Sequence, residues 1–489
     1  MNNKEKAIKG GKWVSISTGV TTILQFLQIS IVARLLEPAS FGVVSISSMI
    51  IVFFTMFSNL GFNNSIISKQ EEDRKVLSSL YFLNIFLGVI IFAIIYISSP
   101  VIASFYDAPD LSSIVKIASL FFLIVYFGQI YSILMQKEMR FKALSIIEVI
   151  TTVIGTAATV LLAYNGYQEY SLIYGQLIMQ IVKTISQIYF GRDLFKPQLH
   201  FKFREIKDHL QFGIYNLGDG IVGFVQSNSD NLLVGKLLGM KMLGYYTLAL
   251  QLAVFPLKRL NPIILQVVYP ILSKIKEDKA GVKRAYLQIL DFISFFNIPI
   301  LAGLFITADS IVPLFYGPGW DPTVQLIQIF VLASFCMYLA HPLFTLVFPN
   351  GKPEWLFYLN IVTLLIKIPL ILILGKYALA EGIAFALVAT SLINLILNFF
   401  IVRFFIGDFM GTFMKNIAKP LLFSGAMMLG ISIYKTLLGY EGILNTILQV
   451  CIGGAIFISL TLAFKISLTE IKSFRKAIFT QLSIAGIAI

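Results

Sequence analysis

Long apolar segments recur along the whole of this 489-residue chain, in which hydrophobic residues make up 57% and charged residues only 13%. A segment of about 20 apolar residues is what a helix needs to cross a bilayer. Lipid offers the backbone no hydrogen bonds, so such segments must be helical. The sequence therefore predicts an all-α polytopic membrane protein with about 14 transmembrane helices. The predicted spans are residues 12–36, 41–62, 76–99, 112–136, 142–163, 169–191, 210–237, 241–272, 284–307, 322–347, 354–375, 380–403, 416–438 and 442–464.

A weak internal duplication runs through these segments. Three stretches return in the same order, 31–47 as 233–249, 102–117 as 312–327 and 135–142 as 347–354. Their offsets correspond to six helices, and an even number keeps the orientation. The sequence therefore predicts two parallel six-helix repeats, or lobes, plus two C-terminal helices. Such halves are typical of secondary transporters that bind substrate between them. The predicted domains are an N-terminal lobe with its linker (1–205), a C-terminal lobe (206–405), and helices 13 and 14 with a cytoplasmic tail (406–489).

The net charge of +13 is distributed in a way that argues against nucleic-acid binding. Most of the 38 Lys and Arg fall in the tails and in alternate loops, which the positive-inside rule assigns to the cytoplasm. We therefore expect a multi-pass protein of the cell membrane, with cytoplasmic N- and C-termini. The loops carry no paired carboxylates, nucleophile elbow or phosphate-binding glycine loop, so we expect no enzyme activity. The scattered Cys and His residues predict no cofactor and no metal site.

Charged residues inside the predicted spans mark the candidate site, because each costs about 2.5–3.5 kcal/mol at the membrane centre on insertion scales. The candidate substrate-binding residues are Arg34, Lys183, Lys258, Arg259 and Lys367. Lys and Arg both suit a phosphorylated cargo. For Arg34 and Lys183, snorkelling or a packing ion pair is an equal alternative. The depth of Lys258, Arg259 and Lys367 favours a shared water-filled cavity between the lobes.

The span at 210–237 contains two acidic residues, Asp219 and Asp230, three helical turns apart on nearly one face. They are candidate ion-coupling residues for Na⁺ or H⁺, and pairing with the basic residues is an equal alternative. In the following span, Pro256, Pro262 and Pro270 surround Lys258 and Arg259 and predict a kinked helix that gates the path.

Five motifs resemble segments of polysaccharide exporters in the multidrug/oligosaccharidyl-lipid/polysaccharide superfamily. They are IVARLLEPASFGVVSISSMI, LMQKEMRFKALSIIEVI, DNLLVGKLLGMKMLGYYTLALQL, FPLKRLNPIILQVVYPILSKIKED and YGPGWDPTVQLIQI. The likeness is greatest to the branch that exports colanic and teichuronic acid, with Wzx-type O-antigen flippases as broader relatives. Family motifs fall on Arg34 with Lys236 as its repeat equivalent, on Asp230 and on Trp320. No family motif assigns a role to Lys183, Lys258, Arg259 or Lys367.

This resemblance implies a transporter for cell-surface polysaccharide biosynthesis, such as that of lipopolysaccharide or exopolysaccharide. It would flip an undecaprenyl-diphosphate-linked oligosaccharide from the inner to the outer leaflet by alternating access. The implied partners are this cargo, membrane lipids, Na⁺ or H⁺, and a polysaccharide polymerase with other assembly proteins. Two rivals remain, a cation-coupled multidrug exporter of the same superfamily, and a membrane polysaccharide polymerase or glycosyltransferase.

Overall fold

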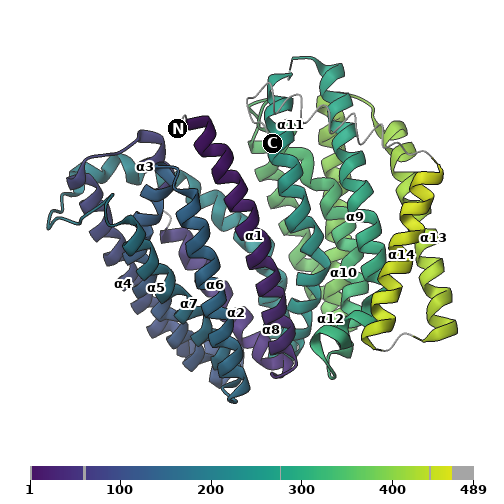
Figure 1. The fold of residues 1–489 in the computed structure, drawn as a ribbon, viewed down its shortest axis with the longest axis horizontal. Coiled ribbons are helices and arrows are strands. Elements are labelled where there is room, and N and C mark those ends of the chain that lie inside the picture. Colours follow the sequence, from purple (N-terminus) through teal and green to yellow (C-terminus); the bar gives the residue numbers. More distant parts are fainter. Residues whose placement is uncertain (1–2, 59–61, 276, 440–441, 465–489) are drawn as a thin grey trace. The chain divides into compact units, whose positions relative to one another are not determined.

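The computed structural model describes residues 3–58, 62–275, 277–439 and 442–464, and the predicted cytoplasmic tail after helix 14 lies outside these ranges. Within them some side chains are not described, chiefly those of 208–219 and 262–271. The regular structure in these ranges is helical, which confirms the predicted all-α class (Figure 1). The elements are α1 (Asn3–Ala33), α2 (Pro38–Ser58), α3 (Phe62–Lys69), α4 (Arg74–Phe105), α5 (Pro109–Lys137), α6 (Phe141–Tyr164), α7 (Gln168–Gly191), α8 (Phe203–Lys274), α9 (Lys279–Tyr316), α10 (Asp321–Ala340), the 3₁₀ turn η1 (His341–Leu343), α11 (Phe344–Val347), α12 (Glu354–Ile406), α13 (Met410–Leu438) and α14 (Ile443–Ala463).

Eleven helices in the described ranges are long and apolar enough to cross a membrane. Two of them contain a backbone break, α8 at Gly239 and α12 at Ala378–Leu379. The more polar α7 is not among the eleven. Dividing α8 and α12 at their breaks and adding α7 accounts for all fourteen predicted spans. The helical assignment of α8 continues through Pro256, Pro262 and Pro270, so its break comes from the glycine and not from the prolines.

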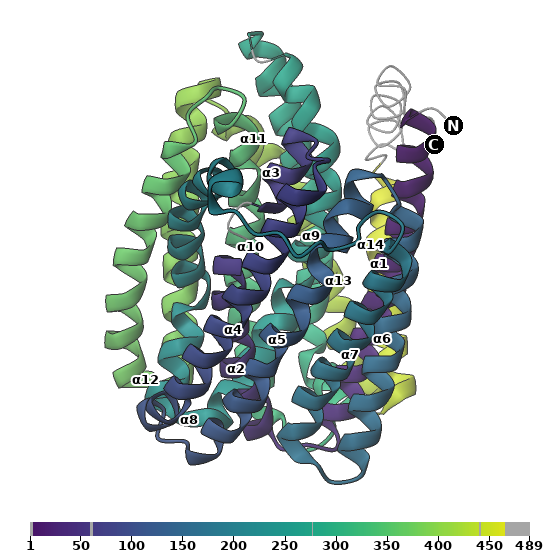
Figure 2. The same ribbon diagram turned by 90° about the vertical axis from the view of Figure 1, so that its left-hand side faces the viewer.

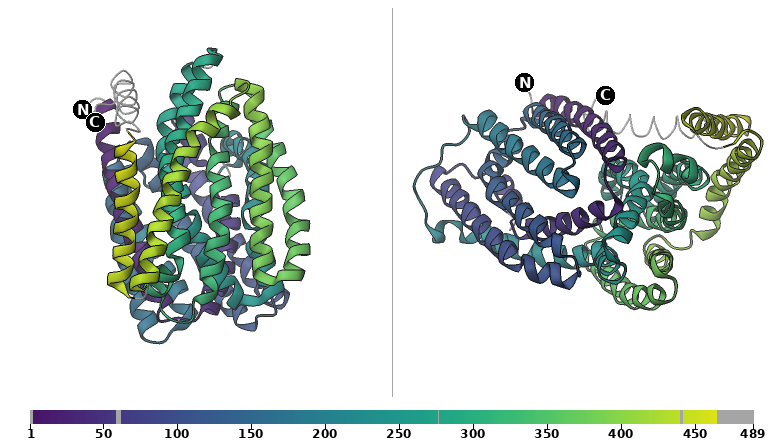
Figure 3. Two further views of the ribbon diagram at one scale, coloured as in Figure 1. Left: turned by 90° about the vertical axis from the view of Figure 1, so that its right-hand side faces the viewer. Right: turned by 90° about the horizontal axis from the view of Figure 1, so that it is seen from below.

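The chain forms two compact units, Met1–Gly244 and Tyr245–Ile489, with the division inside α8. In the first unit, α4 packs on α5, α5 on α7, α7 on α6, and α6 on α1 (Figure 2). In the second unit, α9 packs on α10 and α13, α10 packs on α12, and α14 packs on α13 and α9 (Figure 3). The lobe boundaries expected from the sequence remain a prediction.

The backbone repeats several turn conformations at the spacing of the duplication. Left-handed φ angles occur at Asp107, Met139 and Gln168 in the first unit, and at Gly317, Gly351 and Leu379 in the second. The two sets are spaced by 210, 212 and 211 residues, close to the offsets of the sequence duplication. Since few residues adopt this conformation, its recurrence at matching places supports two copies of one helical plan.

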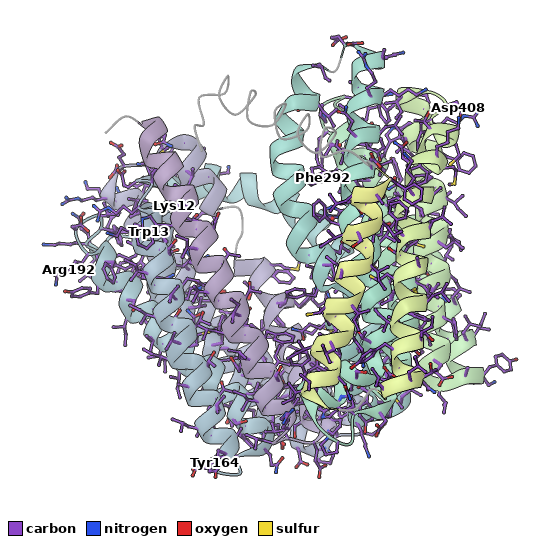
Figure 4. All side chains as sticks on the ribbon, turned by 45° about the vertical axis from the view of Figure 1, so that its right-hand side comes forward. Lys12, Trp13, Tyr164, Arg192, Phe292 and Asp408 are labelled. Atoms are coloured by element: carbon purple, nitrogen blue, oxygen red, sulfur yellow. The ribbon has the colours of Figure 1, made fainter. Side chains whose placement is uncertain are left out.

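Two sets of contacts define opposite ends of the first unit. At the Asp107 end, Lys236 Nζ of α8 lies 2.7 Å from Asp107 Oδ2 in the α4–α5 turn. At the Lys137 end, Lys137 Nζ donates to the Glu71 carbonyl at 2.8 Å. Arg140 also donates two hydrogen bonds to Asp193 there, which hold the pKa of that carboxyl below its usual value. In Figure 4, Tyr164 projects from the far end of α6, away from Trp13 near the start of α1.

Two turns related by the duplication meet within the first unit. The Met240 carbonyl lies against Gly42, where a Cβ would sit 1.9 Å from the oxygen. The Pro38 carbonyl lies against Gly244, where a Cβ would sit 1.8 Å from the oxygen. Gly42 corresponds to Gly244 and Pro38 to Met240 at the offset of 202. The contact is therefore reciprocal, as at a two-fold interface, and the glycines let the two backbones approach closely. We call these four residues the glycine seam.

Candidate functional site

The structure distributes the predicted basic residues over the two units. Arg34 lies in the turn after α1 with an exposed side chain, and Lys183 lies within α7. In the second unit, Lys258 of α8 is exposed, whereas Lys367 of α12 is only 5% exposed. Arg259 belongs to α8, but its side chain is not among those described. The shared cavity for the last three residues thus stays a prediction.

Lys183 has an acidic partner in the adjacent helix. Its Nζ lies 2.8 Å from Glu148 Oε2 of α6. The Lys183 side chain is 30% exposed and that of Glu148 is 45% exposed. The packing of α6 against α7 therefore brings together a charge pair that keeps an open side.

This pair lies well inside its helices. Glu148 is seven residues after the first residue of α6, and Lys183 is eight residues before the last residue of α7. At a rise of 1.5 Å per residue, both lie about 10–12 Å from the helix ends. Charge at such depth is costly in lipid. The pair is the ion pair that the sequence left open as an alternative for Lys183, and its open side is a candidate lining for a hydrated path.

Polar groups continue along the junction of α1 and α6. Thr156 donates its hydroxyl hydrogen to Gln28 Oε1 of α1 at 3.0 Å. The Phe141 ring lies against Gly10, so α1 and α6 run in parallel. This register places Ser17 and Thr21 of α1 near the level of Glu148. The Glu148–Lys183 pair, Gln28 and Thr156 form what we call the polar seam of the first unit.

The two candidate ion-coupling residues both lie in α8, in the part that belongs to the first unit. Asp230 is only 1% exposed, next to Ser229, which is also buried. The side chain of Asp219 is outside the described set. A carboxylate as deeply buried as Asp230 requires hydrogen bonds, a cation or a proton. Ion coupling and pairing with a basic residue therefore both remain predictions for Asp230.

A family model described as "polysaccharide biosynthesis protein" matches residues 31–325. The chain belongs to this family. Its relatives include the lipopolysaccharide biosynthesis protein WzxC of Escherichia coli (strain K12), which is 31% identical over 82% of each chain. The teichuronic acid biosynthesis protein TuaB of Bacillus subtilis (strain 168) is 27% identical over 86% of this chain and 88% of its own.

The fold of this chain is also that of a solved membrane protein. The lipid II flippase MurJ, in an inward closed conformation, superposes with a TM-score of 0.74 at 17% identity. The match covers 92% of this chain and 98% of MurJ. The long apolar helices and this fold identify a multi-pass membrane protein. The family model and the relatives confirm the predicted family resemblance.

Sequence reasoning singled out Lys183 but did not predict its pairing with Glu148. A signal for the pairing was present, because the two residues lie at almost equal distances on either side of the α6–α7 turn at Gly166. Residues equidistant from a short turn face each other in a helical hairpin. Sequence reasoning also missed the buried contact in the second unit where Asn297 Nδ2 donates to Asn261 Oδ1 at 3.3 Å. A single Asn in an apolar span gives no signal of its partner.

Proposed function

We propose that this protein flips an undecaprenyl-diphosphate-linked oligosaccharide from the inner to the outer leaflet, by alternating access, for cell-surface polysaccharide biosynthesis. The observation that carries the proposal is the combination of family and fold. Relatives named for lipopolysaccharide and teichuronic acid biosynthesis share this sequence pattern, and the fold is that of a protein named as a lipid II flippase. A chain with both properties is suited to moving a lipid-linked sugar.

Charges inside the spans support a phosphorylated cargo. Lys183 lies in the polar seam, and Lys367 lies buried in α12, about 20 Å from the start of that helix. Lys258 and Arg259 add further positive charge in α8. A diphosphate can accept several hydrogen bonds from such groups. Arg34, Lys183, Lys258, Arg259 and Lys367 are accordingly the proposed contacts for the diphosphate and sugars.

The proposed setting is the cell membrane, with both termini in the cytoplasm and the Lys137 end facing inward. This orientation follows from the concentration of Lys and Arg at that end. Asp219 and Asp230 are the proposed sites for Na⁺ or H⁺. A polysaccharide polymerase and other assembly proteins are the proposed partners on the far side, and the protein itself is proposed to carry out no covalent chemistry.

Flipping by purified protein in liposomes tests the proposal. Undecaprenyl diphosphate bearing a fluorescent oligosaccharide is incorporated, and a membrane-impermeant quencher reports which leaflet holds the sugar. We expect protein-dependent movement of the sugar with an unchanged mass. A changed saccharide mass would support an enzyme. Movement of cationic drugs in place of the saccharide would support the multidrug exporter.

A further inference from the structure

We propose that Glu148 is a built-in counter-anion. It pairs with Lys183 in the empty carrier, and the diphosphate of the cargo replaces it as the partner of Lys183. The inference rests on the proposed function and assigns a role to a residue that carries none so far. It makes the Glu148–Lys183 pair an anion-exchange site in the first unit. The carboxylate would then set how tightly the cargo is held.

The first argument is the accessibility of the pair. Glu148 and Lys183 lie far from the ends of their helices, yet both side chains are partly exposed. Charge inside a span favours the bundle interior or a water-filled cavity, and a cavity that admits water would give a charged headgroup access to the same place. An incoming diphosphate can therefore approach Lys183 without first separating α6 from α7.

The second argument is a contrast with an ion pair in the second unit. Lys435 Nζ lies 2.6 and 2.7 Å from the two carboxylate oxygens of Asp309 and 2.7 Å from the Ile306 carbonyl. Its side chain is only 13% exposed. This bridge holds α13 against α9 through several bonds at once. Lys183 contacts one Glu148 oxygen and is more than twice as exposed, so its ammonium can exchange partners.

The third argument concerns release. A lysine that bound a diphosphate with no competitor would retain it, and transport requires the cargo to leave. A carboxylate within 2.8 Å repels the phosphate and competes for the ammonium, which lowers the affinity. The four-carbon stem of lysine lets the ammonium turn between the two acceptors. After the diphosphate leaves, Glu148 pairs with Lys183 again and the empty site has no net charge.

Binding and flipping of three variants test this role. Glu148→Gln should raise the affinity for polyprenyl diphosphate about fivefold, the effect of removing one partly exposed charge, and should slow repeated flipping. Lys183→Met should weaken binding. The exchange Glu148→Lys with Lys183→Glu keeps an ion pair but places the ammonium on α6, so it should preserve thermal stability and fail to restore flipping. The matched control exchanges Asp309 and Lys435, where restored flipping is expected because that bridge is structural.

Unchanged affinity in Glu148→Gln would overturn the inference, and so would full recovery of flipping in the Glu148/Lys183 exchange. The binding measurement uses polyprenyl diphosphate alone and does not depend on flipping. A wild-type protein that flips no lipid-linked saccharide would therefore overturn the proposed function only. The affinity ratio of Glu148→Gln to wild type would still decide the role of Glu148.

Discussion

The glycine seam gives a sharp prediction about stability. A Cβ at Gly42 would lie 1.9 Å from the Met240 carbonyl oxygen, and a Cβ at Gly244 would lie 1.8 Å from that of Pro38. Ordinary contact begins near 3.4 Å, so α2 and α8 would have to separate locally by about 1.5 Å. The obstacle is backbone and cannot rotate away. Overpacking of this kind costs about 1–3 kcal/mol, and we expect Gly42→Ala and Gly244→Ala to fall near 3 kcal/mol.

Thermal unfolding of the purified protein in detergent measures this cost. A loss of about 3 kcal/mol lowers Tm by roughly 6–12 °C for a cooperative unit of this size. The controls are Gly19→Ala in α1 and Gly425→Ala in α13, where a Cβ would meet nothing within 4 Å. These changes add a better helix former and should leave Tm unchanged or raise it slightly.

Because the contacts of Gly42 and Gly244 are reciprocal, the double variant Gly42→Ala/Gly244→Ala gives a further prediction. Once one alanine has separated the two turns, the second finds its space already made. The loss of unfolding free energy in the double variant should therefore be clearly smaller than the sum of the losses in the two single variants. Gly42→Ala and Gly244→Ala variants as stable as the two controls would refute the reasoning. Strictly additive losses would show that the two contacts do not form one seam.

Four further predictions concern the transport cycle and topology. Replacing the charge of Lys258 or Arg259 with Gln should abolish export while leaving the folded protein in the membrane, as judged by polymer output and protein level. Flipping in liposomes should depend on membrane potential, which is worth about 2.3 kcal/mol per charge per 100 mV, and equal rates with and without it would contradict this. Asp230→Asn should impair flipping more than Asp219→Asn, since Asp230 is deeply buried and corresponds to the neutral Gln28 at the repeat offset of 202, so the fold itself does not demand the charge. An unaltered rate and ion dependence in Asp230→Asn would count against its role. Cysteine labelling should reach one set of positions from outside and the other from inside, and two adjacent markers on one side would disprove the helix count. The outer set is Asp107, Tyr167, Asp321 and Glu381, and the inner set is Arg74, Lys137, Lys196 and Lys279.

Helix positions could be predicted from the sequence because the membrane imposes a length on every apolar segment. The duplication could be recognised because equivalent turns keep similar sequences and the same conformation, as at Asp107 and Gly317. The short helix α3 was missed, since its eight residues, FNNSIISK, are too few and too polar to resemble a span. The break at Gly239 was predicted as a boundary between spans, although its left-handed φ was not.

The site was predicted less completely than the fold. Charge inside a span signals importance, so Lys183, Lys367 and Asp230 could be named from the sequence alone. Partners depend on which helices pack together, and that information is absent from hydropathy. The pairing of Lys183 with Glu148 therefore needed the packing of α6 against α7. The reciprocal glycine contact likewise needed the approach of α2 to α8.

Flipping of a fluorescent undecaprenyl-diphosphate-linked oligosaccharide in liposomes tests the central claim most directly, with wild type compared to Lys367→Met in the same membranes. The account predicts that wild-type protein moves the labelled sugar between leaflets in a potential-dependent way. It also predicts that Lys367→Met, equally abundant and folded, moves it at least tenfold more slowly, because the buried ammonium in α12 is a proposed contact for the diphosphate. Sugar that stays in its original leaflet with wild-type protein, or that moves as fast with Lys367→Met, would contradict the account.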